Sequence, residues 1–564
     1  MLRLTCLLLI TLMTAPALAH KPPAAAIASA HPLATEAGFQ ILDAGGNAFD
    51  AAIAVAAVLA VVEPAGSGMG GGGFFLLHRA EDGYQTMLDA RETAPARASE
   101  AMYQDKHGDV VRDLAINGPL AAGIPGQAAA FAHLAKNYGA LPLADSLAPA
   151  IRIAQDGFPV GERYRRLAGF RVEVMNRYPA ASAIFLHQGD VPPAGHIIRQ
   201  PDLAAVLERL AKEGHKGFYE GETAERLVRA ARAEGGIWTL EDLASYQVKE
   251  REPIISEFRG ARIISAPPPS SGGIVVAETL NILAEFNDGD IDPALLPHLT
   301  VEAMKRSYHD RAEHLGDPDF VSMPITRLLS KRHARDKAAS IQLDRPTPSS
   351  ELGEPIEQPT GTHTTHFSIL DDEGNRVAAT LSINLPFGSG FVAAGTGILL
   401  NNEMDDFSAK PGAANAYGLV GSLANAIAPG KRPLSSMTPT FVEWDNNVAI
   451  LGTPGGSRII SMVLLGIQEA LAGKPPQDWV SRPRYHHQYL PDIVEAEPAF
   501  IGSPEAGLLT ARGHELKSTG RAYGDMHAIL WEGEKGEVSA ASDPRGEGSA
   551  RVLRGRSGAV NGER

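Results

Sequence analysis

The sequence predicts a protein that contains both helices and strands, because both patterns occur in different parts of the chain. Helical patterns dominate the first half, and the clearest pair of strands follows residue 364. The composition is globular: of 564 residues, 44% are hydrophobic and 21% are charged. Dividing the length by roughly 150 gives three to four domains as a first estimate, although large single folds often break that rule.

The first residues, MLRLTCLLLITLMTAPALAH, have the three parts of an export signal. Arg3 supplies positive charge, residues 4–13 are apolar, and residues 17–19 (ALA) form a small-residue cleavage site. The apolar run is too short for a membrane anchor, which needs roughly 18 residues. We therefore expect a signal peptide at 1–19, a mature chain from His20, and a periplasmic or secreted location.

Cysteine use and net charge exclude several classes of function. Cys6 is the only cysteine and lies inside the expected signal peptide. The mature protein would therefore have no disulfide, no catalytic thiol and no thiolate metal ligand. The formal net charge of −15 argues against nucleic acids and anionic membrane surfaces as partners, since both need a basic footprint.

Helical patterns recur through the first half of the chain. Residues 34–62 are expected to be helical with a turn at DAGGN, 43–47. The segment 50–64 is so rich in Ala and Val that we expect a helix buried on all sides; it is too short for a membrane span. Further helical segments, some interrupted by Gly and Pro, are expected at 118–156, 202–212, 222–234 and 274–286.

The stretch SGMGGGGFFLL, residues 67–77, is a glycine-rich loop that runs into an aromatic strand. Such a loop could cradle phosphate, but it lacks the Lys-Ser/Thr of a P-loop and the spacing of a dinucleotide-binding motif. We favour the simpler interpretation, in which the glycines allow two backbone segments to approach closely.

The pattern changes from polar linker to strands near residue 364. Residues from about 331 to 363 are polar and rich in Pro, which predicts a flexible, exposed linker. THFSIL (365–370), the polar turn 371–375 and RVAATLSI (376–383) then predict two strands joined as a hairpin.

The junction GTHTTHFS, residues 361–368, contains two histidines, but we expect no metal there. His363 and His366 are three apart, and in a strand residues at that spacing point to opposite faces. The adjacent pair at 486–487 meets the same objection, and no acidic residue stands at the spacing of a zincin motif.

Thr364 could be a nucleophile if the chain were cut between His363 and Thr364. A threonine hydroxyl needs a base, and the α-amine of an N-terminal threonine can serve as one. The context permits the cut, because a polar lead-in meets a buried-looking strand at that bond. Taken alone, however, the stretch is more simply explained as a strand that starts with two β-forming threonines.

The rest of the chain resembles the γ-glutamyltransferase family, and the resemblance covers nearly the whole mature chain in order. Segments that resemble the small subunit of the family are TTHFSILDDEGNRVAATLSINLPFGSG (364–390), GILLNNEMDDFS (397–408), KPGAANAYGLVG (410–421), KRPLSSMTPT (431–440), TPGGSRII (453–460), RPRYHHQYLPD (482–492) and ASDPR (541–545). Segments that resemble its large subunit are DAGGNAFDAAIA (43–54), the glycine-rich loop, MLDARETAP (87–95), AINGPLAAGIPG (115–126), APPPSSGG (266–273) and DRAEHLGDPDF (310–320).

The resemblance implies an α+β fold, an αββα sandwich of the N-terminal-nucleophile hydrolase type, with two stacked antiparallel sheets flanked by helices. It also implies self-cleavage, in which the Thr364 hydroxyl attacks the His363 carbonyl carbon and water releases the ester. The products would be a large subunit, 20–363, and a small catalytic subunit, 364–564, interwoven in one domain. The freed α-amine of Thr364 would then be the base.

The resemblance further implies a site for a γ-glutamyl group. Residues that match the carboxylate-binding positions, where a guanidinium fork and hydroxyl donors suit an α-carboxylate, are Arg91, Ser435 and Ser436. Residues that match the ammonium-binding positions are Asn384, Glu403 and Asp406. Gly455 and Gly456 match the pair whose amides would hold the oxyanion.

Two further positions match the family with some change. Ser382 stands where the family can carry a threonine that hydrogen-bonds the nucleophile, so the hydroxyl is kept and the methyl is lost. Glu403 stands where some members have Gln, and either residue can accept from an ammonium. Tyr417 matches the tip of a lid loop over the site, which would hinder water and large acceptors.

We therefore expect a γ-glutamyltransferase and glutathione hydrolase that needs no metal or organic cofactor. Thr364 would take the γ-glutamyl group from glutathione or a related amide and pass it to water, an amino acid or a peptide. One alternative is a glutaryl-type cephalosporin acylase of the same superfamily, whose substrate lacks the ammonium that Glu403 and Asp406 would bind. The other is an unprocessed exported protein that binds γ-glutamyl compounds, although Thr364, Ser382 and the glycine pair favour catalysis.

Overall fold

The computed structural model describes residues 21–286, 292–352, 364–408, 410 and 423–554. The expected signal peptide, His363 and Tyr417 lie outside these residues. Among the helices in the described ranges, none combines the length and the apolar character that crossing a bilayer requires.

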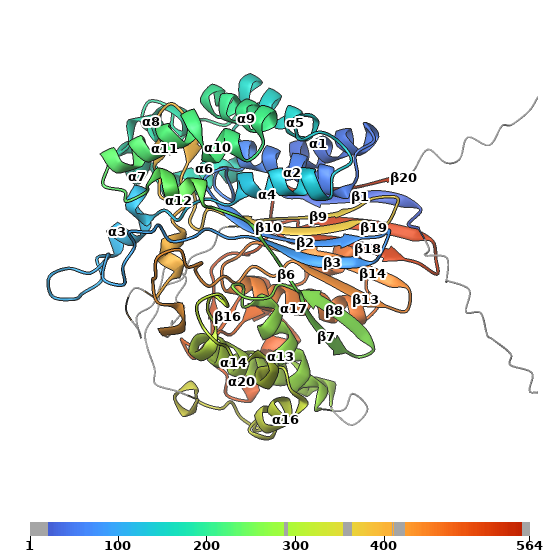
Figure 1. The fold of residues 1–564 in the computed structure, drawn as a ribbon. Coiled ribbons are helices and arrows are strands. Elements are labelled where there is room, and N and C mark those ends of the chain that lie inside the picture. Colours follow the sequence, from blue (N-terminus) through green and yellow to red (C-terminus); the bar gives the residue numbers. More distant parts are fainter. Residues whose placement is uncertain (1–20, 287–291, 353–363, 409, 411–422, 555–564) are drawn as a thin grey trace, which may run out of the picture.

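Two antiparallel sheets lie face to face between two layers of helices (Figure 1). The first sheet has the order β20-β1-β9-β10-β2-β3-β6 and the second has the order β19-β18-β14-β13-β8-β7. The strands of the first sheet are β1 (Ala24–Ser29), β2 (Gly72–Arg79), β3 (Tyr84–Ala90), β6 (Lys249–Arg251), β9 (Thr365–Leu370), β10 (Arg376–Ser382) and β20 (Ser549–Arg554). Those of the second are β7 (Ile254–Phe258), β8 (Ala261–Ser265), β13 (Thr440–Trp444), β14 (Asn447–Gly452), β18 (His527–Glu532) and β19 (Glu537–Ser542). The expected αββα architecture is confirmed.

Helices of the first half cover the outer face of the first sheet, and later helices cover the second. The first layer contains α1 (Pro32–Asp43), α2 (Ala48–Val62), α4 (Gln127–Asn137), α5 (Leu143–Asp156), α6 (Glu162–Gly169), α9 (Pro201–Glu213) and α11 (Gly221–Ala233). The second contains α13 (Gly272–Ala284), α14 (Leu296–His314), α16 (Lys331–Ala339), α17 (Arg458–Leu471) and α18 (Pro476–Ser481). Between the sheets and these layers lie two large apolar clusters, one on each side of the first sheet.

Helix α2 is the buried helix that its Ala/Val-rich sequence predicts, since all fifteen of its residues are buried. It begins with a capping box, in which Asn47 Oδ1 accepts from the Asp50 N–H at 3.1 Å and Asp50 accepts from the Asn47 N–H at 3.0 Å. This cap satisfies backbone donors that burial would otherwise leave without a partner.

The glycine-rich loop has the structural role that we favoured. A Cβ at Gly70, Gly71 or Gly72 would lie 2.1 to 2.2 Å from a carbonyl oxygen of a neighbouring strand or loop. Real Cβ atoms do not come so close, so only glycine lets β2 begin here. The loop therefore packs against the segments that lead to Ser382 and the residues after β12 (Ile398–Leu399).

The predicted linker is partly wrong. Residues 331–339 form α16, and Thr347 and Ser349 are buried. Polar composition suggested exposure, but the polar side chains find partners on other elements: His333 Nε2 lies 2.7 Å from Asp310 Oδ2, and Arg306 donates to Thr347 Oγ1 at 3.0 Å. The remainder of the segment, 353–363, is outside the described residues. The expected helical stretch 118–156 likewise reduces to α4 and α5, because 118–126 is a loop with one 3₁₀ turn.

Segments before and after residue 364 alternate within each sheet. Strand β1 lies between β20 and β9, and β10 pairs with β2. In the second sheet β13 pairs with β8. The two parts of the chain therefore cannot form separate folding units, because each sheet needs strands from both.

Candidate active site

One pocket brings together nine of the residues predicted from the sequence. Its lining includes Arg91, Thr364, Ser382, Asn384, Glu403, Asp406, Ser435, Ser436 and Gly456. They come from the ends of β3, β9 and β10 and from the loops that follow β12 and precede α17. The free volume is about 20 Å³, which is room for roughly one water molecule. A larger ligand therefore has to separate the side chains that now fill the pocket.

Thr364 stands at the start of β9, with only 4% of its surface exposed. In the β9–β10 ladder Leu381 pairs with Thr365, and the next step of that register sets Ser382 opposite Thr364. Directly opposite residues of an antiparallel pair share a face, with Cβ atoms roughly 4.5 to 5.5 Å apart. Ser382 is therefore placed to hydrogen-bond the Thr364 side chain, as the resemblance implied.

Gly455 and Gly456 form a loop that only glycine fits. Gly455 has φ = 145° and Gly456 has φ = 59°, and a Cβ on Gly455 would lie 2.5 Å from the Met462 methyl. In the described part of the chain, neither amide N–H donates to a protein acceptor. Both precede α17, whose N-terminal end carries partial positive charge. The loop thus offers two free backbone donors, and of the two glycines Gly456 lines the pocket that holds Thr364.

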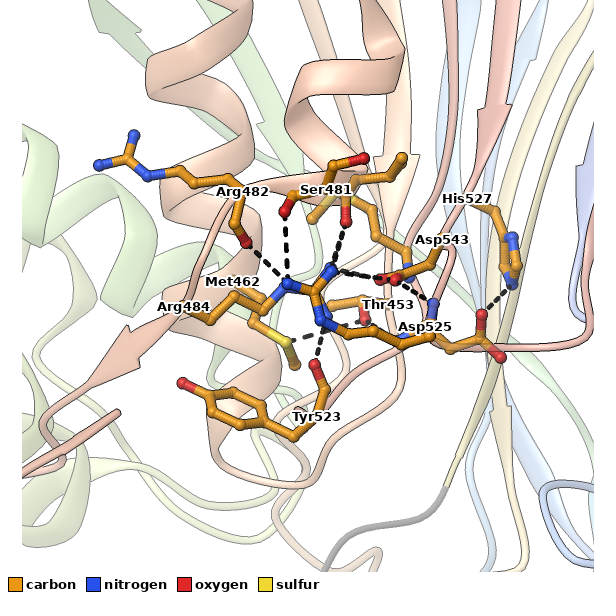
Figure 2. A network of polar contacts seen from close by, with 12 residues as sticks. Thr453, Met462, Ser481, Arg482, Arg484, Tyr523, Asp525, His527 and Asp543 are labelled. Atoms are coloured by element: carbon orange, nitrogen blue, oxygen red, sulfur yellow. Dashed lines mark hydrogen bonds and ion pairs between the residues drawn. The ribbon is translucent and has the colours of Figure 1, made fainter. Parts of the chain in front are cut away.

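A polar network lies behind this loop (Figure 2). The Asp525 N–H donates to Thr453 Oγ1 at 3.2 Å, and that hydroxyl donates to the Pro454 carbonyl at 3.0 Å. Arg484 binds both the Asp543 carboxylate and the Tyr523 carbonyl. The network joins the loop to β18 and α18, so the glycine amides are fixed before any ligand binds.

Asp525 makes stability pH-dependent, and its Asn variant tests this. Burial raises the pKa of Asp525 to about 7, against roughly 4 in an unfolded chain. Between these values the folded state binds more protons, so this residue's contribution to stability falls as pH rises. We expect Asp525→Asn to gain Tm relative to wild type between pH 5 and pH 8, measured by thermal unfolding. Parallel Tm curves for the two proteins would contradict this.

Arg91 is the centre of a buried ion cluster. It follows β3, is fully buried, and donates from Nη1 to Glu403 Oε2 at 2.5 Å and from Nη2 to Asp406. Its Nε donates to the Pro433 carbonyl at 3.3 Å. The residues predicted to bind a carboxylate and those predicted to bind an ammonium therefore hold each other when no ligand is present.

The cluster has more negative than positive groups. Glu92 also faces Arg91, with its Oε2 3.5 Å from Nη1, and neither carboxylate oxygen of Glu92 has a hydrogen-bond partner. Burial raises the pKa of Glu92 to about 7 and raises that of Glu403 well above its ordinary value. Three carboxylates facing one guanidinium favour a ligand that brings its own cation.

The comparisons with known proteins identify the family. A family model described as Gamma-glutamyltranspeptidase matches residues 34–553. The chain belongs to the γ-glutamyltranspeptidase family. It is 42% identical over 526 residues to the glutathione hydrolase proenzyme of Escherichia coli, covering 92% of this chain and 90% of that protein. It is 41% identical over 537 residues to the proenzyme of Pseudomonas aeruginosa, covering 94% of each.

Solved structures agree with the fold and the family. The γ-glutamyltranspeptidase of Helicobacter pylori matches with 40% identity and a TM-score of 0.56, covering 58% of this chain and 94% of that chain. A cephalosporin acylase from Bacillus halodurans matches with 29% identity and a TM-score of 0.82, covering 96% and 99%. The N-terminal-nucleophile hydrolase fold is therefore shared with both a transpeptidase and an acylase.

Two residues of this γ-glutamyltranspeptidase site were not singled out from the sequence. Glu92 sits beside Arg91 in MLDARETAP, and Arg311 belongs to DRAEHLGDPDF. Arg311 donates to Ser436 Oγ at 3.1 Å, and burial lowers its pKa to about 10. Because Ser436 accepts from Arg311, its own proton is free to point elsewhere. Both residues could have been found from the sequence, because each is a charged residue inside a segment that already resembled the family.

Asn384 follows β10 in a strained conformation. Its φ is 72°, in the left-handed region that non-glycine residues avoid. Its N–H donates to Ser382 Oγ at 2.7 Å and its Nδ2 donates to the Asn402 carbonyl at 2.9 Å. These bonds hold Asn384 between Ser382 and the segment that carries Glu403.

Of the two junction histidines, His363 lies outside the described residues and His366 lies in β9. His366 is fully buried, with Nδ1 2.9 Å from Thr380 Oγ1 and its ring against Gly452. A separate cluster of Glu278, Asp310 and His333 has the spacing for a metal. In this cluster Lys337 Nζ already donates to Asp310 Oδ1 at 2.8 Å. The lysine ammonium therefore provides the positive charge that a metal ion would otherwise bring.

Proposed function

We propose that this chain is a self-processing γ-glutamyltransferase and glutathione hydrolase with Thr364 as its nucleophile. The curated relatives from Escherichia coli and Pseudomonas aeruginosa are both called glutathione hydrolase proenzymes, a name that fits a cut precursor. The solved Helicobacter pylori chain is much shorter than this one, since 94% of it covers 58% of this chain. That length is close to the segment before Thr364.

In the proposed reaction, the α-amine of Thr364 takes the hydroxyl proton while Oγ attacks the γ-carbonyl carbon of the substrate. The oxyanion forms at the free amides of Gly455 and Gly456. The C–N bond then breaks, the departing amine takes the proton from the α-ammonium, and an ester of Thr364 remains. Water, or the amine of an amino acid or peptide, attacks this ester and regenerates the hydroxyl.

The observation that carries the substrate class is the excess of carboxylates around Arg91. A γ-glutamyl group has an α-carboxylate and an α-ammonium on one carbon, so it can enter between Arg91 and its partners Glu403 and Asp406. The substrate α-carboxylate accepts hydrogen bonds from the Arg91 guanidinium, and Ser435 and Ser436 are further donors. The substrate α-ammonium donates hydrogen bonds to the carboxylates of Glu403 and Asp406, which no longer bind Arg91. Because the ligand brings one negative and one positive charge, binding leaves the net charge of the cluster unchanged while giving the carboxylates a second cation.

The acylase alternative is less well supported, although the acylase of Bacillus halodurans shares the fold. A glutaryl side chain has a carboxylate but no ammonium. A glutaryl carboxylate bound to Arg91 would displace the carboxylates that Arg91 now binds. Those buried carboxylates would then have no cation beside them, which is unfavourable in free energy. The charges of this site therefore favour a zwitterionic head group.

Asp406→Asn tests this assignment. Because Asp406 is the most exposed carboxylate that binds Arg91, its loss should disturb folding little. We expect kcat/KM for a γ-glutamyl anilide to fall by about 10- to 100-fold, the value of one lost charge-assisted hydrogen bond. Turnover of the matching glutaryl anilide should fall less or rise. Equal losses with the two substrates would argue against an ammonium partner at Asp406.

We also propose that residues 1–19 direct export, so that the protein acts in the periplasm or outside the cell. The positive first residues, short apolar run and ALA at 17–19 support this. The mature chain without cysteine is compatible with an oxidising compartment. Fractionation of cells that express the full chain tests it: the expected finding is a periplasmic or secreted protein that starts at His20, and cytoplasmic retention would contradict it.

A further inference from the structure

A second pocket borders the glycine loop at Pro454 and Gly455. It has a volume of about 420 Å³, and four arginines line it: Arg163, Arg166, Arg521 and Arg545. Gly455 also lines this pocket, whereas the next residue, Gly456, lines the pocket of Thr364. Adjacent residues of the loop whose amides would hold the oxyanion therefore line the two pockets.

Two of the four guanidinium groups are already neutralised by buried carboxylates. Their partners are Glu63 and Asp525 for Arg163, at 3.1 and 3.2 Å, and Glu497 and Asp543 for Arg545, at 2.7 and 3.0 Å. The other two, Arg166 and Arg521, are exposed and have no carboxylate at ion-pair distance in the described part of the chain. The nearby Glu547 instead accepts from the Arg163 backbone N–H at 2.9 Å.

Arg166 and Arg521 are close enough to repel each other. Burial, Arg163 and Arg521 together lower the pKa of Arg166. Placing like charges together is unfavourable, and here it occurs in a chain whose formal net charge is −15. Arg521 is also steadied by Phe170, whose ring centroid lies 5.8 Å from its guanidinium carbon. The arrangement suits an anion, because two exposed guanidinium groups without a carboxylate partner among the described residues line an open pocket.

The geometry of the proposed reaction indicates which anion would bind in the arginine pocket. When the γ-glutamyl head fills the Arg91 pocket and the carbonyl oxygen meets the glycine amides, the amine half of the substrate must leave the carbonyl carbon in another direction. The arginine pocket borders those amides at Gly455. In a γ-glutamyl peptide such as glutathione, that amine half ends in a carboxylate, which suits a guanidinium fork.

We propose that Arg166 and Arg521 bind the carboxylate of the amine half, both in the departing peptide and in an amino-acid or peptide acceptor. This inference rests on the proposed function, because it assumes a γ-glutamyl donor in the Arg91 pocket. It makes the protein selective for leaving groups and acceptors that carry a carboxylate. The positive pair also attracts such anions toward an otherwise acidic protein.

The test compares two donors that differ in one carboxylate: glutathione and glutathione whose glycine carboxylate is an amide. The variant is Arg166→Gln with Arg521→Gln, and the readout is the ratio of kcat/KM for glutathione to that for the amide. We expect this ratio to exceed one in the wild type and to fall about tenfold or more in the double variant, as expected for lost hydrogen bonds to a charged group. The fall should come mainly from KM.

A matched control removes two other exposed arginines, Arg229→Gln with Arg332→Gln, which lie outside this pocket. This control should keep the wild-type ratio. Turnover of a γ-glutamyl anilide, whose leaving group has no carboxylate, reports whether each variant is folded and active. An unchanged ratio in a double variant that still turns over the anilide overturns the inference and leaves the proposed function standing. A wild type that turns over none of the three donors refutes the proposed function, and the inference with it.

Discussion

Replacing Thr364 with alanine is expected to leave one uncut chain and to abolish turnover of γ-glutamyl amides. The variant lacks the Oγ that would attack the preceding carbonyl and, later, the substrate. Loss of a nucleophile that acts together with its base removes almost all catalysis, by roughly 10⁴-fold or more. Thr364 is a small side chain at the start of β9, so its loss should leave the sheet intact.

The neighbouring Thr365→Ala is the matched control for this prediction. Thr365 is the same residue type one step along β9, but its side chain points to the opposite face of the strand. We expect Thr365→Ala to be cut and active. Denaturing gels score the cut, and release of nitroaniline from γ-glutamyl-p-nitroanilide scores the activity. A Thr364→Ala protein that is cut, or that keeps a substantial rate, would rule out Thr364 as the nucleophile.

The second large effect is expected for Gly455→Ala. At φ = 145° an alanine is strained, and its methyl would meet the Met462 methyl. The flexible Met462 side chain can move aside, but the strain at this φ remains, so the backbone of the loop shifts and both free amides shift with it. Losing one oxyanion donor costs about 10²- to 10³-fold in kcat, so we expect a loss at least that large with a smaller change in KM. Rates are divided by the fraction of cut protein, which separates catalysis from maturation.

Gly473→Ala is the control for the backbone cost alone. Gly473 also has a positive φ of 73°, but it lies just beyond the end of α17 with nothing within 4 Å of its Cβ position. It should lower stability by about 1 kcal/mol or less and leave kcat near the wild-type value. If Gly455→Ala behaved like Gly473→Ala, the glycine loop would not be the oxyanion site.

Much of the site could be predicted because its residues lie in short segments that resemble the γ-glutamyltransferase family, in the same order. Arg91, Asp406 and the pair at 455–456 were found in this way, and the structure brings all but Gly455 into one pocket. Hydrophobic pattern also gave α2 and the β9–β10 hairpin, since their periodicity is local. The two-sheet sandwich followed only from the resemblance to the family, and the strand order was not predicted, because pairings such as β1 with β9 join residues far apart in the chain.

The predictions that were wrong or missing share a physical cause. Local composition does not show which residues from distant segments will contact a given stretch of the chain. The segment from 331 reads as polar linker, yet Asp310 and Arg306 of α14 supply the partners that bury part of it. Arg311 was missed because its role depends on Ser436, 125 positions away. The arginine pocket was missed for the same reason, since Arg166 and Arg521 become neighbours only when α6 meets the loop before β18.

The central claim is that the chain cuts itself to expose Thr364, and N-terminal sequencing with intact-mass measurement of the purified, exported protein tests it most directly. The account predicts two fragments, one that starts at His20 and one that starts at Thr364, and a single chain in Thr364→Ala. A single uncut chain in both proteins would contradict the catalytic mechanism and would favour a protein that only binds γ-glutamyl compounds.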